Sequence, residues 1–394
     1  MGFEPLQEEL KTIAAEGLLR SWKKIEKMDG GRIQVAGRWF IHLASNSYLG
    51  LHQHPKVIAA AGQAAQEYGT GAGSARLIGG TFSLHERLEE KLAVFKQAQA
   101  ALVFPTGYMA NLGCITALVG PGDLVIGDHL NHASLIDACR LSRATFRVYP
   151  HKDVARLEAA LRARRKIYRR TLLVTEGLFS MDGDIAPLRE IAAIAQKYEA
   201  WLLIDDAHAT GVLGPEGRGS LEHCGISTEG IIQMGTLSKA LGSLGGFIAG
   251  PKVVIDLLKN KARSFIYTTA LPPASVAAAV EALQIIQQEP RWRTQLWKNV
   301  KTWISGFNEM NGQSIAAEGP IVPLVIGDSL LTMEMAQRLL ELGVYAPGIR
   351  PPTVPPGSAR IRVSLTALHT ERDLTDALDA FRTVFKHTTA QVDA

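Results

Sequence analysis

The length, composition and charge of the chain describe a sizeable globular protein without a strong charge preference. It has 394 residues, 46% of them hydrophobic, and its 42 basic and 38 acidic residues give a formal net charge of +4. This length suits a large domain joined to a smaller one, and so mild a charge gives no argument for nucleic acid as a partner. Cys114, Cys139 and Cys224 are widely spaced and form no Cys-x-x-Cys pair, which disfavours a disulfide framework or a metal site and fits a reducing cytoplasm.

The N-terminal residues predict neither a signal sequence nor a lipid anchor. Leu6, Leu10 and Ile13 recur at helical spacing among acidic residues, which predicts an amphipathic helix and differs from a basic, hydrophobic leader. Leu6 stands where a myristoylation signal after Met1-Gly2 requires Ser or Thr. No uninterrupted apolar run approaches the length of a membrane helix. We therefore expect a cytoplasmic protein with no membrane partner.

Short apolar runs alternate along the chain with longer, helix-compatible stretches. The runs that predict strands are 101–104, 124–126, 171–175, 201–204 and 231–234. Such alternation is typical of an α/β domain with a mostly parallel, helix-covered sheet. Polar residues follow directly after these runs, namely Thr106-Gly107-Tyr108, Asp128, Glu176-Gly177, Asp205-Asp206 and Thr236. Because ligands bind outside the carboxyl ends of the strands in such a sheet, we expect these residues to meet in one pocket.

The C-terminal part of the chain has an α+β pattern. After Pro272-Pro273 a helical pattern covers residues 274–288, and strand-like or helix-like stretches follow at 321–326, 333–342 and 360–365. We expect an N-terminal segment over residues 1–45, a large cofactor-binding domain over 46–285 and a smaller domain over 286–394. A long helix is able to span the boundary near residue 285.

Two stretches superficially suggest phosphate or nucleotide binding. Residues 69–80 are rich in glycine but lack the Gly-Lys-Ser/Thr of a P-loop, and the preceding residues 59–68 predict a helix where a dinucleotide fingerprint needs a strand. This disfavours a nucleotide-binding dehydrogenase and predicts a tight loop of close backbone approach. The basic run 162–170 is interpreted as a solvated helix end, the alternative being a surface for an acidic carrier protein or a nucleotide phosphate.

The segment 235–242, Gly-Thr-Leu-Ser-Lys-Ala-Leu-Gly, places Lys239 among small and hydroxyl-bearing residues. Taken alone, such a lysine belongs to a flexible surface loop. Within a site, desolvation lowers the pKa of a lysine and makes its amine a nucleophile, and the electrophile that suits it is the aldehyde of pyridoxal phosphate. That cofactor also needs a carboxylate for its ring nitrogen, and Asp205 is a candidate whose alternative role is to cap a helix.

Two histidines and one turn are candidates for the remaining cofactor contacts. His208 is a candidate donor to the phenolate oxygen and His132 is a candidate to stack on the ring, although a structural role is the alternative for both. The stretch from Thr106 to Asn111 follows a strand and enters a helix. It therefore places backbone amides at a helix N-terminus, where phosphate binds, the alternative being an ordinary strand-to-helix turn.

Together these residues resemble the α-oxoamine synthase family, pyridoxal-phosphate enzymes of the aspartate-aminotransferase fold (fold type I). Motifs in the family's order cover nearly the whole chain: Ser45-Asn-Ser-Tyr-Leu-Gly50, residues 69–80, Thr106-Gly-Tyr108, His132-Ala-Ser134, residues 175–184, Asp205-Asp-Ala-His208, Thr236-Leu-Ser-Lys239 and residues 267–273. The resemblance implies an α/β large domain with a mostly parallel sheet and a smaller α+β C-terminal domain. It also implies pyridoxal 5′-phosphate as the cofactor and no metal.

The resemblance implies a role for each candidate residue. Lys239 forms a Schiff base with the cofactor, Asp205 pairs with its ring nitrogen, and His208 contacts its phenolate oxygen. His132 stacks on the ring and completes the predicted catalytic set. The other positions that match contacts to the cofactor or its phosphate are Gly107, Tyr108, Ser180 and Thr236, together with Thr268 or Thr269 from a second subunit. The contact from a second subunit implies an obligate homodimer with shared active sites.

Residues 349–355, Ile-Arg-Pro-Pro-Thr-Val-Pro, resemble the branch of the family that condenses L-alanine with a pimeloyl thioester in biotin biosynthesis. This resemblance implies that Arg350 binds the carboxylate of the amino acid. The implied substrate-binding residues are Arg20, Asn46, His132, Arg350 and Thr353. One departure is Ser47, which stands where the family often has an acidic residue, and it bears on the branch and not on the cofactor chemistry.

The implied activity is a decarboxylative Claisen condensation of L-alanine with a pimeloyl group carried by coenzyme A or by acyl carrier protein. Lys239 is expected to remove the Cα proton, and carbon dioxide and the free thiol leave. Two alternatives with the same chemistry are glycine C-acetyltransferase and 5-aminolevulinate synthase activities, which use glycine. An alternative of another class is a non-catalytic partner subunit, which the retention of Lys239, Asp205, His132 and His208 disfavours.

Overall fold

A computed structural model of the chain describes residues 2–164, 167–311 and 315–392. The chain forms two compact units, a larger one of Asn46–Ser180 and Asp184–Thr294 and a smaller one of Met1–Ser45, Met181–Gly183 and Gln295–Ala394. The division near the C-terminus falls inside α12 (Arg291–Asn311). The observed units differ from the expected segments because residues 1–45 contribute strands to the smaller unit and do not stand apart.

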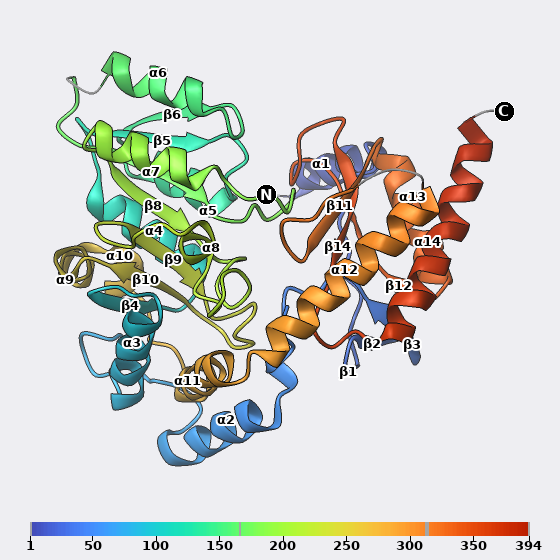
Figure 1. The fold of residues 1–394 in the computed structure, drawn as a ribbon, viewed down its shortest axis with the longest axis horizontal. Coiled ribbons are helices and arrows are strands. Elements are labelled where there is room, and N and C mark those ends of the chain that lie inside the picture. Colours follow the sequence, from blue (N-terminus) through green and yellow to red (C-terminus); the bar gives the residue numbers. More distant parts are fainter. Residues whose placement is uncertain (1, 165–166, 312–314, 393–394) are drawn as a thin grey trace. The chain divides into compact units, whose positions relative to one another are not determined.

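The larger unit is built on a sheet whose strands alternate with helices along the chain (Figure 1). Its strands are β4 (Ala100–Phe104), β5 (Leu124–Asp128), β6 (Thr145–Tyr149), β7 (Thr171–Glu176), β8 (Trp201–Asp205), β9 (Ile232–Thr236) and β10 (Gly246–Gly250). Among the described residues this sheet is seven-stranded, in the order β4-β10-β9-β8-β7-β5-β6. Neighbours from β9 to β6 pair in parallel, whereas β10 pairs antiparallel with β9 and β4. The predicted mostly parallel sheet is confirmed.

Helices cover both faces of this sheet, which explains its apolar strands. They are α2 (Pro55–Tyr68), α3 (Ser83–Phe95), α4 (Gly107–Leu118), α5 (Ala133–Leu141), α6 (Val154–Arg164), α7 (Leu188–Lys197), α8 (Ser220–Cys224), α9 (Lys252–Lys261), α10 (Arg263–Ile266) and α11 (Pro273–Gln288). Leu172 and Val174 of β7 pack in a core with α4 and α5, whereas Leu173 between them packs in a second core with α6 and α7. Side chains of a strand alternate between faces, so a strand buried on both sides is apolar throughout.

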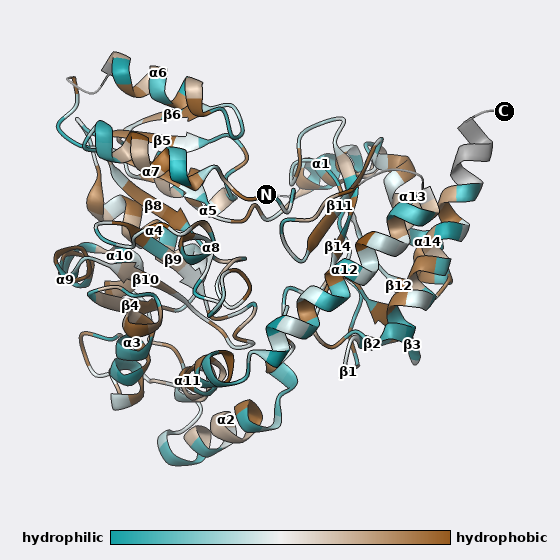
Figure 2. Ribbon diagram, in the orientation of Figure 1, coloured by the Kyte–Doolittle hydropathy of each residue, from teal (hydrophilic) through white to brown (hydrophobic). Residues whose placement is uncertain are grey.

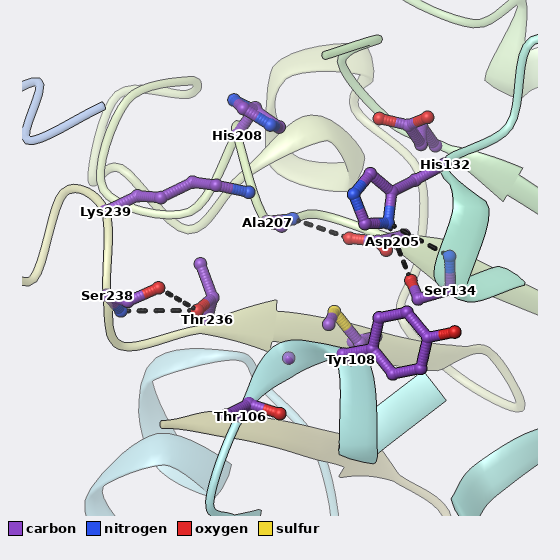
Figure 3. Close-up of a pocket in the computed structure, with 13 residues that line it drawn as sticks. Thr106, Tyr108, His132, Ser134, Asp205, Ala207, His208, Thr236, Ser238 and Lys239 are labelled. Atoms are coloured by element: carbon purple, nitrogen blue, oxygen red, sulfur yellow. Dashed lines mark hydrogen bonds between the residues drawn. The ribbon is translucent and has the colours of Figure 1, made fainter. Parts of the chain in front are cut away.

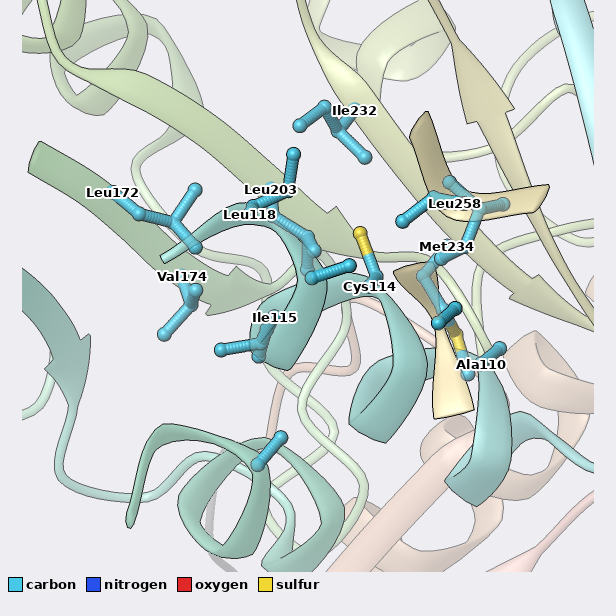
Figure 4. Packing of buried hydrophobic residues seen from close by; sticks show 14 of the residues in the cluster. Ala110, Cys114, Ile115, Leu118, Leu172, Val174, Leu203, Ile232, Met234 and Leu258 are labelled. Atoms are coloured by element: carbon cyan, nitrogen blue, oxygen red, sulfur yellow. The ribbon is translucent and has the colours of Figure 1, made fainter. Parts of the chain in front are cut away.

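The helix α4 packs along the centre of the first core. Ala110, Cys114, Ile115 and Leu118 of this helix lie close to sheet residues that include Leu203 and Met234 (Figure 4). All of these side chains are almost completely buried. Figure 2 shows the apolar strands of this sheet in brown, with helices around them that mix brown and teal. The close packing of α4 fixes the position of its N-terminus at one end of β9.

The smaller unit has the expected α+β character. One of its sheets contains β1 (Lys27–Asp29), β2 (Arg32–Val35), β3 (Arg38–His42) and β12 (Val344–Tyr345), and another contains β11 (Ile321–Gly327), β13 (Gly348–Ile349) and β14 (Ala359–Ser364). Its helices are α1 (Glu4–Ala15), most of α12, α13 (Ser329–Glu341) and α14 (Glu371–Val392). The pairing of β3 with β12 joins residues near the two ends of the chain.

The structure bears on three expectations about the N-terminal helix, the basic run 162–170 and membrane-spanning helices. The predicted N-terminal amphipathic helix forms as α1, but no residue of it is buried. The basic run 162–170 begins at the end of α6, and its residues 165 and 166 lie outside the described residues. Among the residues that the structure describes, no helix combines the length and the apolar character needed to span a membrane.

Candidate functional site

A cavity of about 230 Å³ in the larger unit collects most of the polar residues that follow the strands (Figure 3). Its lining residues are Thr106, Gly107, Tyr108, His132, Ser134, Glu176, Asp205, Ala207, His208, Met234, Thr236, Ser238 and Lys239. They lie at the carboxyl ends of β7, β8 and β9 and in the first turns of α4 and α5. This is the edge of a parallel sheet at which α/β proteins bind their ligands.

Lys239 lies in the connection between β9 and β10 and extends into the cavity (Figure 3). The connection is held by backbone hydrogen bonds from Leu237 to Gly245, at 2.9 Å, and from Gly242 to the Lys239 carbonyl, at 2.9 Å. The Thr236 hydroxyl donates to the Gly245 carbonyl at 2.8 Å and accepts from the Ser238 backbone amide at 3.2 Å. The hydroxyl residues around the lysine therefore shape its loop.

Asp205 ends β8 with its carboxylate buried, and the side chain points to the cavity. Its Oδ1 accepts a hydrogen bond from the Ala207 backbone amide at 2.9 Å, and its Oδ2 accepts one from the Asn111 side-chain amide at 2.7 Å. Both donors are neutral. A buried carboxylate is stabilised far more by a cation than by neutral donors, so Asp205 suits a positively charged ligand group.

His132 caps the N-terminus of α5 and lines the cavity beside Asp205. Its Nδ1 lies 2.8 Å from the Ser134 hydroxyl and accepts a hydrogen bond from the Ser134 backbone amide at 3.2 Å. Desolvation by the surrounding protein lowers the pKa of His132, and the charge of Lys239 acts in the same direction, whereas Asp205 opposes it. His132 is therefore neutral at physiological pH.

Glu176, at the end of β7, places a second carboxyl group in the cavity. Its Oε2 accepts from the Ser180 backbone amide at 3.0 Å, and its buried Oε1 has no hydrogen-bond partner within the described structure. Burial foremost, and then the negative charge of Asp205, raise the pKa of Glu176 to about 8. The cavity thus contains the Asp205 carboxylate, which suits a cation, and the Glu176 carboxyl group, which holds a proton.

His208 lies on the far side of the cavity from Tyr108 (Figure 3) and contacts the motif that contains Asn46. The Tyr48 hydroxyl lies 2.5 Å from His208 Nδ1 and also donates to Asn46 Oδ1 at 3.3 Å. His208 is buried. Ser47, the departure from the family pattern, bonds to His52 Nδ1 at 2.6 Å and does not line the cavity.

The first turn of α4 brings backbone amides to the cavity. Thr106 caps this helix, and its hydroxyl accepts from the Met109 amide at 3.1 Å. The amides of Gly107 and Tyr108 belong to the first turn, where helix geometry provides no partner within the helix. Tyr108 is partly exposed, and its hydroxyl donates to Asp137. Such a helix N-terminus binds anions.

Some expected residues do not line this cavity. The Asp206 carboxylate faces the core and pairs with buried Lys96 at 2.9 Å, because consecutive strand residues point to opposite faces. Asp128 bonds to His151 at 3.0 Å instead. The expectation that one pocket uses every polar residue after a strand is therefore wrong for Asp128 and Asp206. Ser180 is buried behind Glu176.

Thr268 and Thr269 line a separate, small cavity of about 10 Å³. Thr269 pairs with Ala75 of the glycine-rich loop 69–80 in an isolated β-bridge. The glycine-rich loop is thus tied to the segment before α11. Neither threonine lines the cavity that contains Lys239 of the same chain.

The predicted substrate residues of the smaller unit lie together within that unit. Arg20 donates to the Thr353 hydroxyl at 3.2 Å, and Arg350 donates to the Leu19 carbonyl oxygen at 2.8 Å and contacts the Met333 sulfur at 2.9 Å. The buried Nε of Arg350 has no hydrogen-bond partner among the described residues. No carboxylate of the described chain is paired with Arg350 in an ion pair, so its guanidinium suits an external anion.

Several residues that line the cavity or contact its lining had no predicted role. Asn111 and Ser134 stand inside recognised motifs, but their contacts join residues far apart in the sequence, and nothing in a single sequence indicates which side chains of α4 and α5 meet. Ser238 was visible only as part of the lysine segment. The sequence placed Glu176 after a predicted strand, but it gave no indication that the side chain is buried.

The comparison with known proteins matches nearly the whole chain. Residues 39–381 match the family described as aminotransferase class I and II. The chain is 46% identical to an 8-amino-7-oxononanoate synthase of Symbiobacterium thermophilum, covering 96% of this chain and 97% of that protein. It is 44% identical to 8-amino-7-oxononanoate synthase 1 of Bacillus subtilis, covering 98% of each.

Solved structures agree with this match. A serine palmitoyltransferase variant from S. paucimobilis, solved with a bound PLP–myriocin aldimine, superposes with a TM-score of 0.92 at 33% identity and covers 98% of each chain. An 8-amino-7-oxononanoate synthase from Francisella tularensis superposes with a TM-score of 0.75 at 27% identity, over 89% of this chain and 99% of that one. The fold type I expectation is confirmed. The chain belongs to the aminotransferase class I and II family and, within it, to the α-oxoamine synthases.

Proposed function

We propose that the chain catalyses the decarboxylative condensation of L-alanine with a pimeloyl thioester, which yields 8-amino-7-oxononanoate, carbon dioxide and free thiol in biotin biosynthesis. Relatives named for this product match the chain nearly end to end. The observation that carries the proposal is the cavity in which Lys239, the Asp205 carboxylate and neutral His132 meet.

The cavity fits pyridoxal 5′-phosphate, the cofactor of this protein. Asp205 offers a buried carboxylate that accepts hydrogen bonds from two neutral amides, which suits the protonated ring nitrogen. The first-turn amides of α4 suit the phosphate. A Cβ at Gly107 would lie 2.8 Å from the Met234 Cε and 3.6 Å from the Thr236 hydroxyl. Glycine therefore keeps open the space between this helix turn and β9.

Bound pyridoxal phosphate supplies an aldehyde that condenses with amines and a ring that delocalises the negative charge left on the amino acid Cα. Asp205 keeps the ring nitrogen protonated through its negative charge. Lys239 would hold the cofactor through its amine, and the same amine would accept the Cα proton of the amino acid and return a proton to the product. His132 donates a hydrogen bond to a substrate oxygen on which charge develops.

We propose that Arg350 binds the alanine carboxylate, since its guanidinium contacts a carbonyl oxygen and a sulfur and, within the described residues, no anion. Arg20 and Thr353, which bond to each other in the same unit, are proposed to contact the acyl substrate. Asn46 is proposed to contact the substrate, and its side-chain oxygen accepts a hydrogen bond from Tyr48, whose hydroxyl also lies beside His208.

The test of the function compares thiol release for L-alanine and glycine, each with pimeloyl, acetyl and succinyl thioesters. We expect alanine with a pimeloyl thioester to react at least about tenfold faster than the other pairs. Preference for glycine with an acetyl or succinyl donor would instead support the two related activities. No turnover with any pair, together with no visible absorbance from a lysine-bound cofactor, would support a non-catalytic subunit.

Lys239→Ala tests the role of the lysine. We expect its turnover to fall by about a thousandfold or more, because the tether and the base are both lost. Near wild-type turnover of this variant would contradict the proposal. Coenzyme A and acyl carrier protein donors are compared in the same assay, since the proposal covers both carriers.

We further propose a homodimer in which Thr268 or Thr269 of one subunit contacts the phosphate in the other subunit's cavity. This is supported by their position away from the cavity of their own chain. Mixed dimers of Lys239→Ala with a Thr268→Ala, Thr269→Ala double variant then contain one intact site. At limiting cofactor we expect the mixture to be more active than either variant alone. If the mixture is no more active, the threonines belong to the site of their own chain.

We propose a cytoplasmic location. The three cysteines are free thiols, and Cys114 and Cys139 are buried. Burial raises the pKa of Cys139 to about 12 and that of Cys114 still further. Buried, protonated thiols are unreactive and fit a reducing compartment.

A further inference from the structure

Asn111 joins the two side chains that are proposed to contact the cofactor ring. It lies in α4 and is completely buried. Its side-chain nitrogen lies 2.7 Å from Asp205 Oδ2 and 2.8 Å from the Ser134 hydroxyl. Its side-chain oxygen is buried without a hydrogen-bond partner in the part of the chain that the structure describes.

The direction of these hydrogen bonds follows from the Asp205 carboxylate. An ionised carboxylate only accepts hydrogen bonds, so the amide nitrogen of Asn111 must face it, and the second amide hydrogen then points to Ser134. The Ser134 oxygen accepts this hydrogen and keeps its own hydrogen for His132 Nδ1, 2.8 Å away. The Ser134 backbone amide also donates to Nδ1, at 3.2 Å. Two donors therefore point at the same ring nitrogen.

We propose that Asn111 is a positioning residue that orients Asp205 and, through Ser134, holds His132 as the tautomer with its hydrogen on Nε2. In this tautomer Nδ1 is bare, and Nε2, the ring nitrogen turned away from Ser134 and toward the open side of the cavity in Figure 3, donates a hydrogen bond. His132 then cannot accept a proton at the nitrogen that faces the substrate. Lys239 remains as the proton acceptor, and His132 serves the carboxylate or thioester oxygen.

The unpartnered oxygen of Asn111 supports this role. A leucine has a similar size and would avoid burying a polar atom without a partner, which is unfavourable in a protein core. The rest of α4 around this position is apolar, including Ala110 and Cys114. An asparagine is needed here only if both of its amide hydrogens have partners, and Asp205 and Ser134 are those partners.

The inference rests on the proposed function for the reaction that it serves, but its main test does not measure turnover. Full-length protein is labelled with ¹⁵N in its histidine rings and studied by NMR with and without cofactor, and the His132 signals are assigned from their loss in His132→Asn. We expect the Nδ1 of neutral His132 to be bare and Nε2 to carry the hydrogen. A hydrogen on Nδ1 would overturn the proposal.

Two variants separate the branches of the network. Asn111→Leu removes both, so we expect a detectable share of the Nδ1–H tautomer and a cofactor dissociation constant raised about tenfold or more. Ser134→Ala removes only the branch to His132, so we expect the Nδ1 resonance to shift and the cofactor dissociation constant to rise less than in Asn111→Leu. Wild-type values of both readouts in Asn111→Leu would overturn the proposal.

Ser142→Ala is the matched control. Ser142 is a buried serine at the other end of α5, where its hydroxyl donates to the Cys139 carbonyl at 2.7 Å. We expect its loss to change neither the His132 spectrum nor the cofactor affinity, even where the melting temperature falls. If alanine and pimeloyl thioester prove not to be substrates, these readouts still decide the role of Asn111.

Discussion

Glu176 holds a proton because the cavity disfavours a second negative charge. Burial foremost, with the charge of Asp205, raises its pKa to about 8, while Lys239 and two backbone amides oppose the shift. The amide of Ser180 donates to Oε2 at 3.0 Å, and the backbone amide of His132 also lies close to the carboxyl group. At the residue scale, Glu176 therefore holds its proton beside the Asp205 carboxylate.

Glu176→Gln keeps the shape of this side chain and removes its titration. The folded-state pKa lies above the unfolded value of 4.5, so the native chain binds the proton more tightly and loses this stabilisation as pH rises from about 4.5 through 8. We expect the cofactor-free variant to match wild type at about pH 5 and to exceed it by about 1–3 kcal/mol at about pH 9. Urea unfolding at both pH values measures this, and an equal difference at both would contradict it.

Asp205→Asn and its neighbour Asp206→Asn are predicted to fail in different ways. Asp205 faces the cavity, so we expect Asp205→Asn to fold normally and to lose about a thousandfold in turnover at saturating cofactor. Asp206 accepts from buried Lys96 and from the Ser220 backbone amide. Its loss leaves a buried cation uncompensated, so we expect Asp206→Asn to be destabilised by about 3–5 kcal/mol. Calorimetry and steady-state kinetics separate the two, and swapped phenotypes would refute the assignment.

The identity of these residues was predictable and their contacts were not. Lys239, Asp205 and His132 stand in ordered motifs, and the position of Asp205 after a strand predicts which end of the sheet it occupies. The hydrogen bonds of Asn111 to Ser134 and Asp205 span 23 and 94 residues. Such contacts depend on how α4 packs against the sheet, which no local pattern encodes.

At the scale of single elements, the N-terminus of α4 shows how one turn serves both stability and binding. The Thr106 hydroxyl caps the helix and orients the amides of its first turn. We expect Thr106→Ala to lower the free energy of unfolding by about 1 kcal/mol and to weaken cofactor binding. Asp328, which caps α13 in the smaller unit through Leu331 at 2.7 Å, is the matched control. Asp328→Ala should cost similar stability and leave cofactor affinity unchanged, and fluorescence titration of both variants checks this.

Most elements of the sheet were predictable from apolar runs, and the exceptions have physical reasons. β5, β7, β8 and β9 agree with the predicted runs to within a few residues because they are buried on both faces. β10 was not predicted, since its sequence Gly-Phe-Ile-Ala-Gly is short and bounded by glycines. The strands β1 to β3 were missed because they are short, are only partly buried and carry charged residues.

At the scale of the whole molecule, the titration of His151 makes the free energy of unfolding depend on pH. Partial burial opposes its charge, but hydrogen bonds to Asp128 and Asp184 raise its pKa to about 9. The folded-state pKa exceeds the unfolded value of 6.5, so the stabilisation is complete below about pH 6.5 and is lost as pH rises through 9. We expect His151→Gln to be less stable than wild type by on the order of 2 kcal/mol at about pH 6 and nearly equal above about pH 10. A constant difference across denaturation curves at these pH values would contradict the assignment.

The position of Lys239 between two paired strands limits how the lysine is able to move. β9 and β10 pair antiparallel up to Thr236 and Gly246, and the connection is closed further by the bonds at Gly245 and Gly242. Its Cα is thus anchored, and a Cβ at Gly242 would lie 2.3 Å from the His52 backbone nitrogen, so the loop has little room to shift. Release of the cofactor, proton transfer and recapture must then be accomplished by rotation about the four-carbon stem alone. The Lys239 Cα stays in place while its side chain rotates. A shorter or longer amine at this position would therefore fail to reach either the cofactor or the Cα of the amino acid.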